Sequence, residues 1–329
     1  MKTKIAILGS GMLGAYLDKY FEYYDKSKYF IKMYSQNAVD ITDYKAVESV
    51  VNEFDYILNC AAYTNVDKAE LEPELCYAVN ADAVLNLAKL CNTYHKKLVH
   101  ISTDFVYGGD KIDKQHRYKI PEFDFTNPIN VYGQSKLHGE NNILNNMLNN
   151  YLILRVSWTF GITGNNFIKK ISEQLLDKNK TYIEVVDDQI GRPTSIHLIA
   201  KVIDSFIQGH ISSKIYNLQN SGEPVSKYGL AKFIAKVLKS KVKIKPCSSD
   251  KFPGAKRQYN SYLECSKICT EINVDRKTWE EAIAEDWRKT KAWQPIKEYL
   301  AQLYPEKVIL NKNKQGKIKK LWLTIKNLF

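Results

Sequence analysis

Short apolar runs alternate with longer stretches of helical pattern along the first half of the chain. The runs are rich in Val, Ile, Leu and Tyr, as buried strands are. They are Lys4–Leu8, Phe30–Tyr34, Tyr56–Asn59, Leu98–Ser102 and Leu152–Val156. Strands that alternate with helices must run parallel, with helices on both faces of the sheet. The pattern therefore predicts an α/β fold with a doubly wound parallel sheet of the Rossmann type.

The order of elements becomes less regular after about residue 160. Helices are expected near Asn165–Asp177, Ile196–Ile207, Lys227–Lys239, Cys265–Ile272 and Thr278–Arg288, and strands near Tyr182–Val186, Ile215–Leu218 and Val242–Lys245. This order predicts a smaller C-terminal α+β unit. We expect a first domain over residues 1–160, an interleaved second domain over 161–290 and an appendage over 291–329. Residues 196–218 are expected to return to the first sheet.

Composition narrows the class of protein. The chain has 329 residues, of which 44% are hydrophobic and 26% charged. A compact chain of this length buries roughly 75% of its unfolded surface and needs no disulfide or metal to fold. The cysteines are scattered, without a C-x-x-C pair, which favours reduced thiols in the cytoplasm. No apolar run is long enough for a membrane span, and glycines interrupt the apolar start at once.

The formal net charge of +12 is unevenly distributed. Residues 305–329 hold seven lysines and one glutamate, so half of the excess lies in this tail. The remaining chain shows no basic stripe, which argues against nucleic-acid binding. Apolar residues of the tail recur at helical spacing, as Ile318, Leu321, Trp322, Ile325, Leu328 and Phe329. We expect a basic amphipathic helix that contacts a membrane surface, its own body or a partner such as the second subunit of a homodimer.

A glycine motif follows the first strand directly. Gly9, Gly11 and Gly14, with Met12 and Leu13 between them, lie where the strand ends and a helix begins. Glycines there permit a tight turn and close backbone approach, and the helix N-terminus holds a pyrophosphate. The motif predicts a dinucleotide site.

The residues at the end of the second strand do not select between NAD and NADP. Residues 33–37 carry neither an acid for the ribose of NAD nor an arginine for the phosphate of NADP. Asp40, in the run Val39–Asp43, lies slightly further along and could reach the adenine. A second interpretation, in which Thr42 or Asp43 caps a helix, is compatible with this one.

Tyr132 and Lys136 are four residues apart, which places both on one face of a helix. A lysine cation near a phenol would lower the pKa of Tyr132 toward neutrality. The strand over residues 98–104 brings the hydroxyls of Ser102 and Thr103 to the ligand-binding edge of the sheet. A hydroxyl, a phenol and a lysine beside a dinucleotide cleft indicate carbonyl reduction.

Several blocks resemble one family, the dTDP-4-dehydrorhamnose reductases of the extended short-chain dehydrogenases/reductases. The blocks are Val39–Asp43, Asn59–Glu70, Asn80–Asp82, Ser102–Tyr107, Pro128–Lys136, Arg155–Trp158, Asp188–Thr194 and Asn260–Leu263. The resemblance extends over about residues 4–288. It implies that the first domain binds the dinucleotide and that the second binds the substrate.

The resemblance also implies residue roles. Tyr132 would be the proton donor, Lys136 its activator and a ribose ligand, and Thr103 the orienting hydroxyl. The expected cofactor-binding residues are Gly9, Gly11, Met12, Leu13, Gly14, Asp40, Ile41, Ala61, Ala62, Tyr63, Tyr132 and Lys136. The expected substrate-binding residues are Val66, Thr103, Asp104, Phe105, Tyr132, Trp158 and Arg257.

Three features depart from the family pattern. The glycine motif is one residue shorter than usual. Phe105 stands where a tyrosine is common, which removes a hydroxyl from the sugar pocket. The segment Gly108–Asn130 is longer than usual and carries the basic residues Lys111, Lys114, Arg117 and Lys119. The last two departures lie where the substrate pocket is formed.

Other candidate residues have simpler interpretations. Trp158 alone is typical of a core aromatic, and the resemblance favours a ligand platform instead. Asp187 and Asp188 are expected to hold a loop before a helix at Ser195. The histidines have no helical pair spacing, so no metal site is predicted.

We therefore expect NAD(P)H-dependent reduction of the 4-keto group of a nucleotide-linked 4-dehydro-6-deoxyhexose, for the biosynthesis of a surface glycan. The simplest substrate is dTDP-4-dehydro-L-rhamnose, reduced to dTDP-L-rhamnose, and NADPH is favoured over NADH. Two alternatives stay open. One is a UDP-linked or other keto-sugar, and the other is a regulatory subunit resembling the β subunit of methionine adenosyltransferase.

Overall fold

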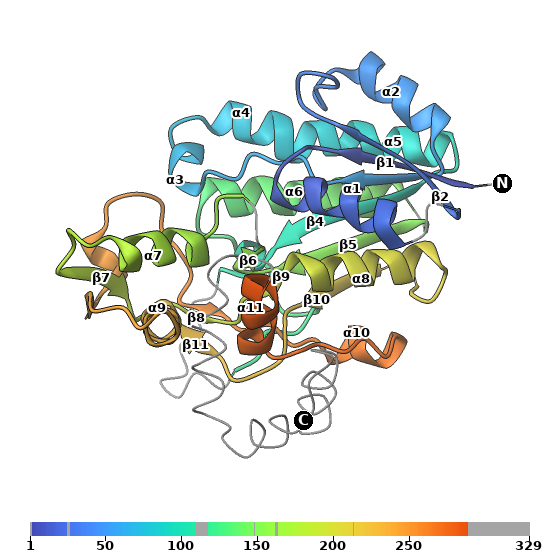
Figure 1. Cartoon of the computed structure of the whole chain (residues 1–329). Helices are drawn as coiled ribbons and strands as arrows, with labels where there is room; N and C mark the ends of the chain where they lie inside the picture. Colours follow the sequence, from blue (N-terminus) through green and yellow to red (C-terminus); the bar gives the residue numbers. More distant parts are fainter. Residues whose placement is uncertain are drawn as a thin grey trace, which may run out of the picture.

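A six-stranded parallel sheet lies at the centre of the computed structural model, which describes residues 2–24, 27–108, 118–147, 149–161, 164–212 and 214–288 (Figure 1). The strands are β1 (Thr3–Leu8), β2 (Tyr29–Tyr34), β3 (Tyr56–Asn59), β4 (Lys97–Thr103), β5 (Tyr151–Val156) and β10 (Lys214–Leu218). Their order is β10-β5-β4-β3-β1-β2, and every neighbouring pair is parallel. The predicted doubly wound fold is confirmed, and the strand order switches direction between β1 and β3.

The strands alternate side chains between two hydrophobic cores. Ile5 and Ile7 of β1 enter one core, and Ala6 and Leu8 enter the other. The first core packs against α1 (Met12–Tyr24) and α8 (Ile196–Ile207), and the second against α2 (Tyr44–Glu53), α5 (Ala83–Thr93) and α6 (Val131–Asn146). Helices therefore cover both faces of the sheet, as the alternation of the sequence requires (Figure 1).

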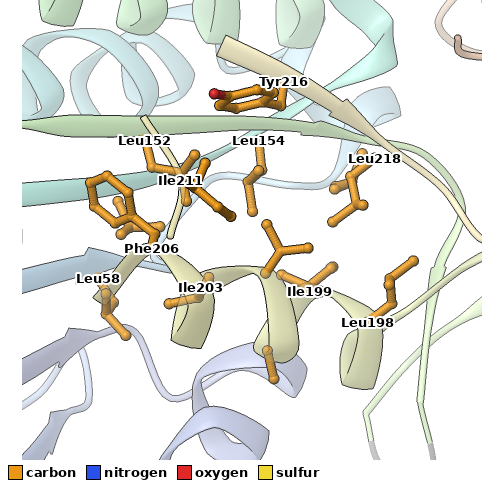
Figure 2. Close-up of a cluster of buried hydrophobic side chains, with 14 of the residues drawn as sticks. Leu58, Leu152, Leu154, Leu198, Ile199, Ile203, Phe206, Ile211, Tyr216 and Leu218 are labelled. Carbon is orange, nitrogen blue, oxygen red and sulfur yellow. The ribbon is translucent and has the colours of Figure 1, made fainter. Parts of the chain in front are cut away.

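Helix α8 packs in the same hydrophobic core as side chains of β5 and β10. In Figure 2 its side chains point toward those of the strands; the labelled residues are Leu58, Leu152, Leu154, Leu198, Ile199, Ile203, Phe206, Ile211, Tyr216 and Leu218. Full burial of each such aliphatic side chain is worth about 1.5–3 kcal/mol relative to exposure. The segment 196–218 thus returns to the sheet and extends it beside β5.

A smaller α+β unit is built from segments after β5. Its core joins α7 (Phe167–Leu176) and α9 (Lys227–Leu238) to the parallel pair β7 (Tyr182–Val186) and β12 (Lys243–Cys247).

The other described elements of the chain are short. The remaining strands are β6 (Thr159–Phe160), β8 (Ile190–Gly191), β9 (Thr194–Ser195), β11 (Val225–Ser226) and β13 (Asn260–Ser261). The remaining helices are α3 (Val66–Ala69), α4 (Pro73–Tyr77), α10 (Ser266–Glu271) and α11 (Trp279–Arg288), with short turns η1 (Ala78–Asp82), η2 (Asp104–Tyr107) and η3 (Ser249–Lys251).

Two predicted features lie outside the described residues. They are the basic positions Lys111, Lys114 and Arg117, and the amphipathic tail over 291–329. Within the described residues, no helix is long and apolar enough to cross a bilayer. All six cysteines are described, and each is free.

Candidate active site

An added side chain would have different consequences at each of the three glycines of the first turn. Gly9 has a φ of 98°, and a Cβ there would lie 2.7 Å from the backbone nitrogen of Ala61. A Cβ on Gly14 would overlap the carbonyl oxygen of Gly9, so α1 could not pack against the turn. A Cβ on Gly11 would meet nothing within 4 Å. Gly9 and Gly14 are therefore required by the fold, whereas nothing in the fold fills the space beside Gly11, so its predicted role at a pyrophosphate stays a prediction.

Met12 and Leu13 anchor the start of α1. The Sδ of Met12 accepts a hydrogen bond from Asn166 at 3.6 Å, which connects the glycine turn to the segment before α7. Leu13 packs against the core beneath α1 and α8. Both residues lie at the predicted cofactor turn, and their side chains fix its position.

The segment after β2 places Asp40 in an Asx turn. Asp40 Oδ1 accepts hydrogen bonds from the nitrogen and the hydroxyl of Thr42, at 2.9 and 2.8 Å, and these bonds lower the pKa of its carboxyl group. Ile41 is buried in the core. Asp43 caps α2, so the capping interpretation is confirmed for that residue. A role for Asp40 at the adenine stays a prediction.

Residues 61–63 follow β3 at the switch point. Asn80 holds Tyr63 by accepting from its backbone nitrogen at 2.9 Å and donating to its carbonyl oxygen at 3.0 Å. Asn80 also donates to the hydroxyl of Ser135 on α6, at 3.0 Å. It lies in the π-helical turn η1, a distortion that often occurs at functional sites. The cofactor loop is thus tied to the helix that carries Tyr132 and Lys136.

Tyr132 and Lys136 lie one turn apart on α6, as predicted. Asn130 caps this helix, since its Oδ1 accepts from the nitrogen of Gly133 at 2.8 Å. Thr103 is the last residue of β4 and is buried. The expected hydroxyl, phenol and lysine therefore belong to two adjoining elements at one edge of the sheet.

Burial governs the electrostatics of Tyr132. It raises the pKa of the phenol above its ordinary value, and a hydrogen bond with the Thr103 side chain acts in the opposite direction. The expectation that Lys136 lowers this pKa toward neutrality is wrong for this structure. The reason is that the Lys136 ammonium is engaged by β4 and that Tyr132 lies in a poorly solvated place.

Lys136 is an almost fully buried ammonium. Its Nζ donates to the carbonyl oxygen of Ile101 at 2.7 Å and lies 3.0 Å from Nε2 of His100. Burial lowers its pKa to about 8, against an opposing effect of Glu140. Glu140 is itself paired with Arg155 at 2.5 Å behind the site.

The Asp104 carboxyl group is buried beside the candidate catalytic hydroxyls of Thr103 and Tyr132. It accepts from the Thr103 hydroxyl at 3.0 Å and from Nε2 of Gln258 at 2.7 Å. Burial raises its pKa to about 6. Phe105, two residues after Thr103, meets the ring of Tyr132 edge-on, with the centroids 5.5 Å apart. The position where a hydroxyl is lost relative to the family pattern is therefore in contact with the candidate proton donor.

Trp158 has features of a core aromatic residue and of an exposed platform for a ligand. It packs against the core of the smaller unit, yet it is partly exposed, with a φ of 45° that a bulky residue rarely adopts. The Nζ of Lys227 lies 5.5 Å from the centre of the Trp158 ring. Burial lowers the pKa of Lys227 to about 8, and the nearby charge of Arg257 lowers it further. A strained aromatic residue thus lies beside one cation, Lys227, which in turn feels the charge of Arg257.

Arg257 connects the smaller unit to the sheet. Its guanidinium is paired with Asp67 at 2.8 Å, next to Val66 at the start of α3. Asp67 also accepts from the nitrogen of Ala255 at 3.0 Å. Val66 and Arg257, predicted on the same pocket from distant parts of the sequence, therefore lie on segments that contact each other.

Asp187 and Asp188 do hold loops, but not the one expected. Asp187 accepts from Ser226, the cap of α9, and Asp188 accepts from the backbone nitrogen of Ser249 at 2.7 Å. Ser195 caps α8 with its own hydroxyl.

Sequence reasoning missed four polar side chains at the site, namely Asn80, His100, Lys227 and Gln258. His100 had a signal, because it is a polar residue within an apolar strand. Asn80 lay in a block that was noted only for its resemblance. Lys227 and Gln258 had no signal in the sequence, since the folding of the smaller unit is what brings them to the site.

The chain is similar to known proteins over most of its length. The family model described as RmlD substrate binding domain matches residues 3–291. The dTDP-4-dehydrorhamnose reductase of Aggregatibacter actinomycetemcomitans is 36% identical, covering 85% of this chain and 97% of the relative. The dTDP-4-keto-6-deoxy-D-glucose reductase of Streptomyces niveus is 32% identical, covering 67% of this chain and 74% of the relative.

A solved structure is similar over nearly the whole described chain. It is the dTDP-4-dehydrorhamnose reductase of Bacillus anthracis in complex with NADP, with a TM-score of 0.80 and 34% identity, covering 88% of this chain and 100% of that one. Sequence and structure thus agree across both the sheet and the smaller unit. The chain belongs to the dTDP-4-dehydrorhamnose reductase family.

Proposed function

We propose that this protein reduces the 4-keto group of dTDP-4-dehydro-L-rhamnose to give dTDP-L-rhamnose, with NADPH favoured over NADH. The observation that carries the proposal is the placement of Thr103, Tyr132 and Lys136 on β4 and α6, beside a glycine turn that is open at Gly11. Membership of the family supports the choice of substrate.

The residues present fit a dinucleotide. The turn at Gly11 would hold its pyrophosphate at the start of α1, and the loop of Ala61, Ala62 and Tyr63 would line it. A bound reduced nicotinamide supplies the hydride in this chemistry. Residues 35–39, directly after β2, include no acid, and the NADP complex of the Bacillus anthracis relative supports NADPH.

The proton comes from Tyr132. Because burial raises the pKa of the phenol, Tyr132 keeps its proton until a substrate oxygen that gains negative charge can accept it. The O–H bond of Tyr132 breaks as the new O–H bond of the sugar forms. The Thr103 hydroxyl orients the same oxygen, and the Lys136 ammonium stabilises the phenolate that is left.

The substrate is held by the smaller unit. Trp158 offers a flat ring, and Lys227 and Arg257 offer positive charge toward a nucleotide diphosphate. Val66, Asp104 and Phe105 would shape the pocket around the sugar. Phe105 replaces a hydroxyl by an apolar edge, so it favours a sugar contact that does not need a hydrogen bond there.

A second substrate deserves a test because of one relative. The Streptomyces niveus protein is named for dTDP-4-keto-6-deoxy-D-glucose, which has the same base and keto position but a different ring configuration. The UDP-linked keto-sugar and the non-catalytic regulatory subunit are further outcomes that the same experiment separates.

The test measures the loss of reduced-nicotinamide absorbance with each of the three sugars, and with NADPH or NADH. We expect turnover with dTDP-4-dehydro-L-rhamnose that falls by a factor on the order of 10² or more in Tyr132→Phe. Tyr94→Phe is the control, because the Tyr94 hydroxyl contacts only Glu48 on α2 among the described residues. Cofactor binding without turnover on any sugar would favour the regulatory subunit instead.

We further propose that the enzyme acts in the cytoplasm, which its free thiols support. Contact of the tail over 291–329 with a membrane or a second subunit stays a prediction. Co-sedimentation of the full chain and of a chain truncated at residue 290 with anionic liposomes tests it, and equal pelleting would contradict the membrane alternative.

A further inference from the structure

Three buried polar side chains form a line from Lys136 into the sheet. Lys136, His100 and Asn59 are each 1% exposed. Nζ of Lys136 lies 3.0 Å from Nε2 of His100, and Nδ1 of His100 lies 3.2 Å from the amide of Asn59. Asn59 and His100 are register partners on the neighbouring strands β3 and β4. The line therefore crosses from α6 through two strands.

The protons on this line follow from the ammonium. A charged lysine has only donors, so the His100 nitrogen that faces it must carry a lone pair. Nε2 is then unprotonated, and the proton of the neutral ring lies on Nδ1. Burial keeps the pKa of His100 well below its ordinary value, and the Lys136 charge lowers it further, so the ring is neutral.

Asn59 can complete this arrangement. Nδ1–H of His100 needs an acceptor, and Oδ1 of Asn59 is a buried oxygen without a hydrogen-bond partner among the described residues. Oxygen and nitrogen of an amide exchange places by a half-turn of the side chain. In that orientation Oδ1 accepts from Nδ1–H, which fixes the tautomer from the side of β3.

The line leaves Lys136 with one unused donor. Two of its three N–H groups go to β4, one to the carbonyl oxygen of Ile101 at 2.7 Å and one to His100. Within the described part of the chain, Nζ has no third hydrogen-bond partner. The remaining N–H is therefore available to a bound ligand or to the phenolate of Tyr132.

We propose that His100 is a positioning residue which, as the neutral Nδ1–H tautomer held by Asn59, fixes the Lys136 ammonium on β4 and orients its third N–H toward the reacting groups. The inference concerns the lysine of the proposed reductase site, and only its rate measurements rest on the proposed function. It gives the buried histidine a defined task that a merely space-filling residue would not have.

The direct test uses the full chain labelled with ¹⁵N-histidine. Long-range ¹H–¹⁵N correlation spectra distinguish the two tautomers, and the His100→Gln variant identifies the His100 signals. We expect Nδ1–H, with no titration between about pH 5 and 8. An Nε2–H tautomer, or a ring that titrates near its ordinary pKa, would overturn the proposal.

The second test compares pH profiles of kcat. Besides His100 and the Tyr132 phenol one turn earlier on α6, the charged or titratable groups that face Lys136 are Glu140 on α6, Cys76 on α4 and Cys60 after β3. None of them is altered in His100→Leu, which removes the acceptor. We expect its alkaline limb to move to lower pH by on the order of one unit, because a neutral acceptor stabilises the ammonium.

Two variants make this comparison specific. His100→Gln keeps an acceptor near the place of Nε2 and should keep the limb close to that of the parent. His138→Gln, on the exposed side of α6, is the control and should leave the limb in place. A His100→Leu limb equal to the parent's would overturn the proposal. If no sugar is reduced, the proposed function fails, while the tautomer spectrum still decides this inference.

Discussion

The two sides of the active site are built in different ways. The proposed cofactor side consists of the glycine turn after β1 and the loop after β3, where backbone approach sets the shape. The proposed substrate side consists of Trp158, Lys227 and Arg257, which come from separate segments. Packing of the smaller unit brings Lys227 over the Trp158 ring and within reach of the charge of Arg257. Local sequence therefore determines the first side, whereas long-range packing of side chains determines the second.

This difference has a consequence for mutations. A change on the cofactor side acts through the backbone, so its effect depends on whether a single added Cβ can be accommodated. A change on the substrate side acts through charge and contact, and the fold should tolerate it. Substitutions on the two sides should therefore separate stability, cofactor affinity and substrate affinity.

The largest effect is expected for Gly14→Ala compared with Gly11→Ala. The added Cβ at Gly14 overlaps the Gly9 carbonyl, which should destabilise the fold by about 3 kcal/mol or more. The Cβ at Gly11 meets open space, so stability should change by less than about 0.5 kcal/mol. Thermal unfolding measures both variants.

Gly11→Ala should nevertheless lose cofactor affinity, because its methyl group occupies the space proposed for the pyrophosphate. We expect the Kd for NADPH to rise by on the order of tenfold or more, measured by fluorescence titration. An unchanged Kd in this stable variant would mean that the cofactor does not approach the turn at Gly11.

On the substrate side, Lys227→Met should raise the KM for the nucleotide sugar. Loss of one charged hydrogen bond corresponds to a factor of roughly 10 to 100, while the Kd for NADPH stays the same. The matched control is Lys232→Met on the same helix, because Lys232 lies over the ring of Tyr228 on the exposed side. Equal KM values for the two variants would remove Lys227 from the substrate site.

A further prediction concerns the pH dependence of the rate and distinguishes two lysines with similar pKa values. Burial lowers the pKa of Lys136 to about 8, so its charge is present below that pH and is lost as the pH rises through it. The rate should fall above about pH 8, by up to tenfold per pH unit. Tyr132 does not cause this limb, because burial moves its pKa in the opposite direction, upward.

Lys227→Met tells the two lysines apart, since the pKa of Lys227 is also lowered to about 8. We expect the variant to keep the alkaline limb of kcat at saturating substrate. Loss of the limb would assign it to Lys227.

The same pKa shifts affect stability. Between about pH 8 and 10.5 a lysine in the unfolded chain holds more protons than a buried one, so the free energy of unfolding should rise with pH over this range.

The cofactor side could be predicted from the sequence better than the substrate side, because it depends on local sequence and not on long-range packing. The strands, the glycine turn and the spacing of Tyr132 and Lys136 follow from local periodicity, and the structure has them where expected. The error on the cofactor side concerned the pKa of Tyr132, because spacing shows that a lysine is near but not how strongly the surroundings desolvate the partly exposed phenol. Lys227 was missed because only tertiary packing brings α9 beside Trp158.

The smallest effect is expected at the contact that joins the two sides. Asp67, next to Val66 after β3, pairs with Arg257 and accepts from the nitrogen of Ala255. The bond from Arg257 lowers the pKa of Asp67, so the pair persists at neutral pH and is lost only as the pH falls through that lowered value. A partly exposed pair of this kind is worth about 0.2–1 kcal/mol.

Asp67→Asn keeps an oxygen for Ala255 but removes the charge, so it isolates the ion pair from the loop contact. We expect a rise in KM for the sugar of at most about fivefold, with unchanged kcat and cofactor Kd. Glu53→Gln, which removes an exposed carboxylate at the end of α2, serves as the control. A large fall in kcat in Asp67→Asn would mean that Arg257 acts on the reacting groups, and the separation between a backbone-built cofactor side and a charge-built substrate side would no longer hold.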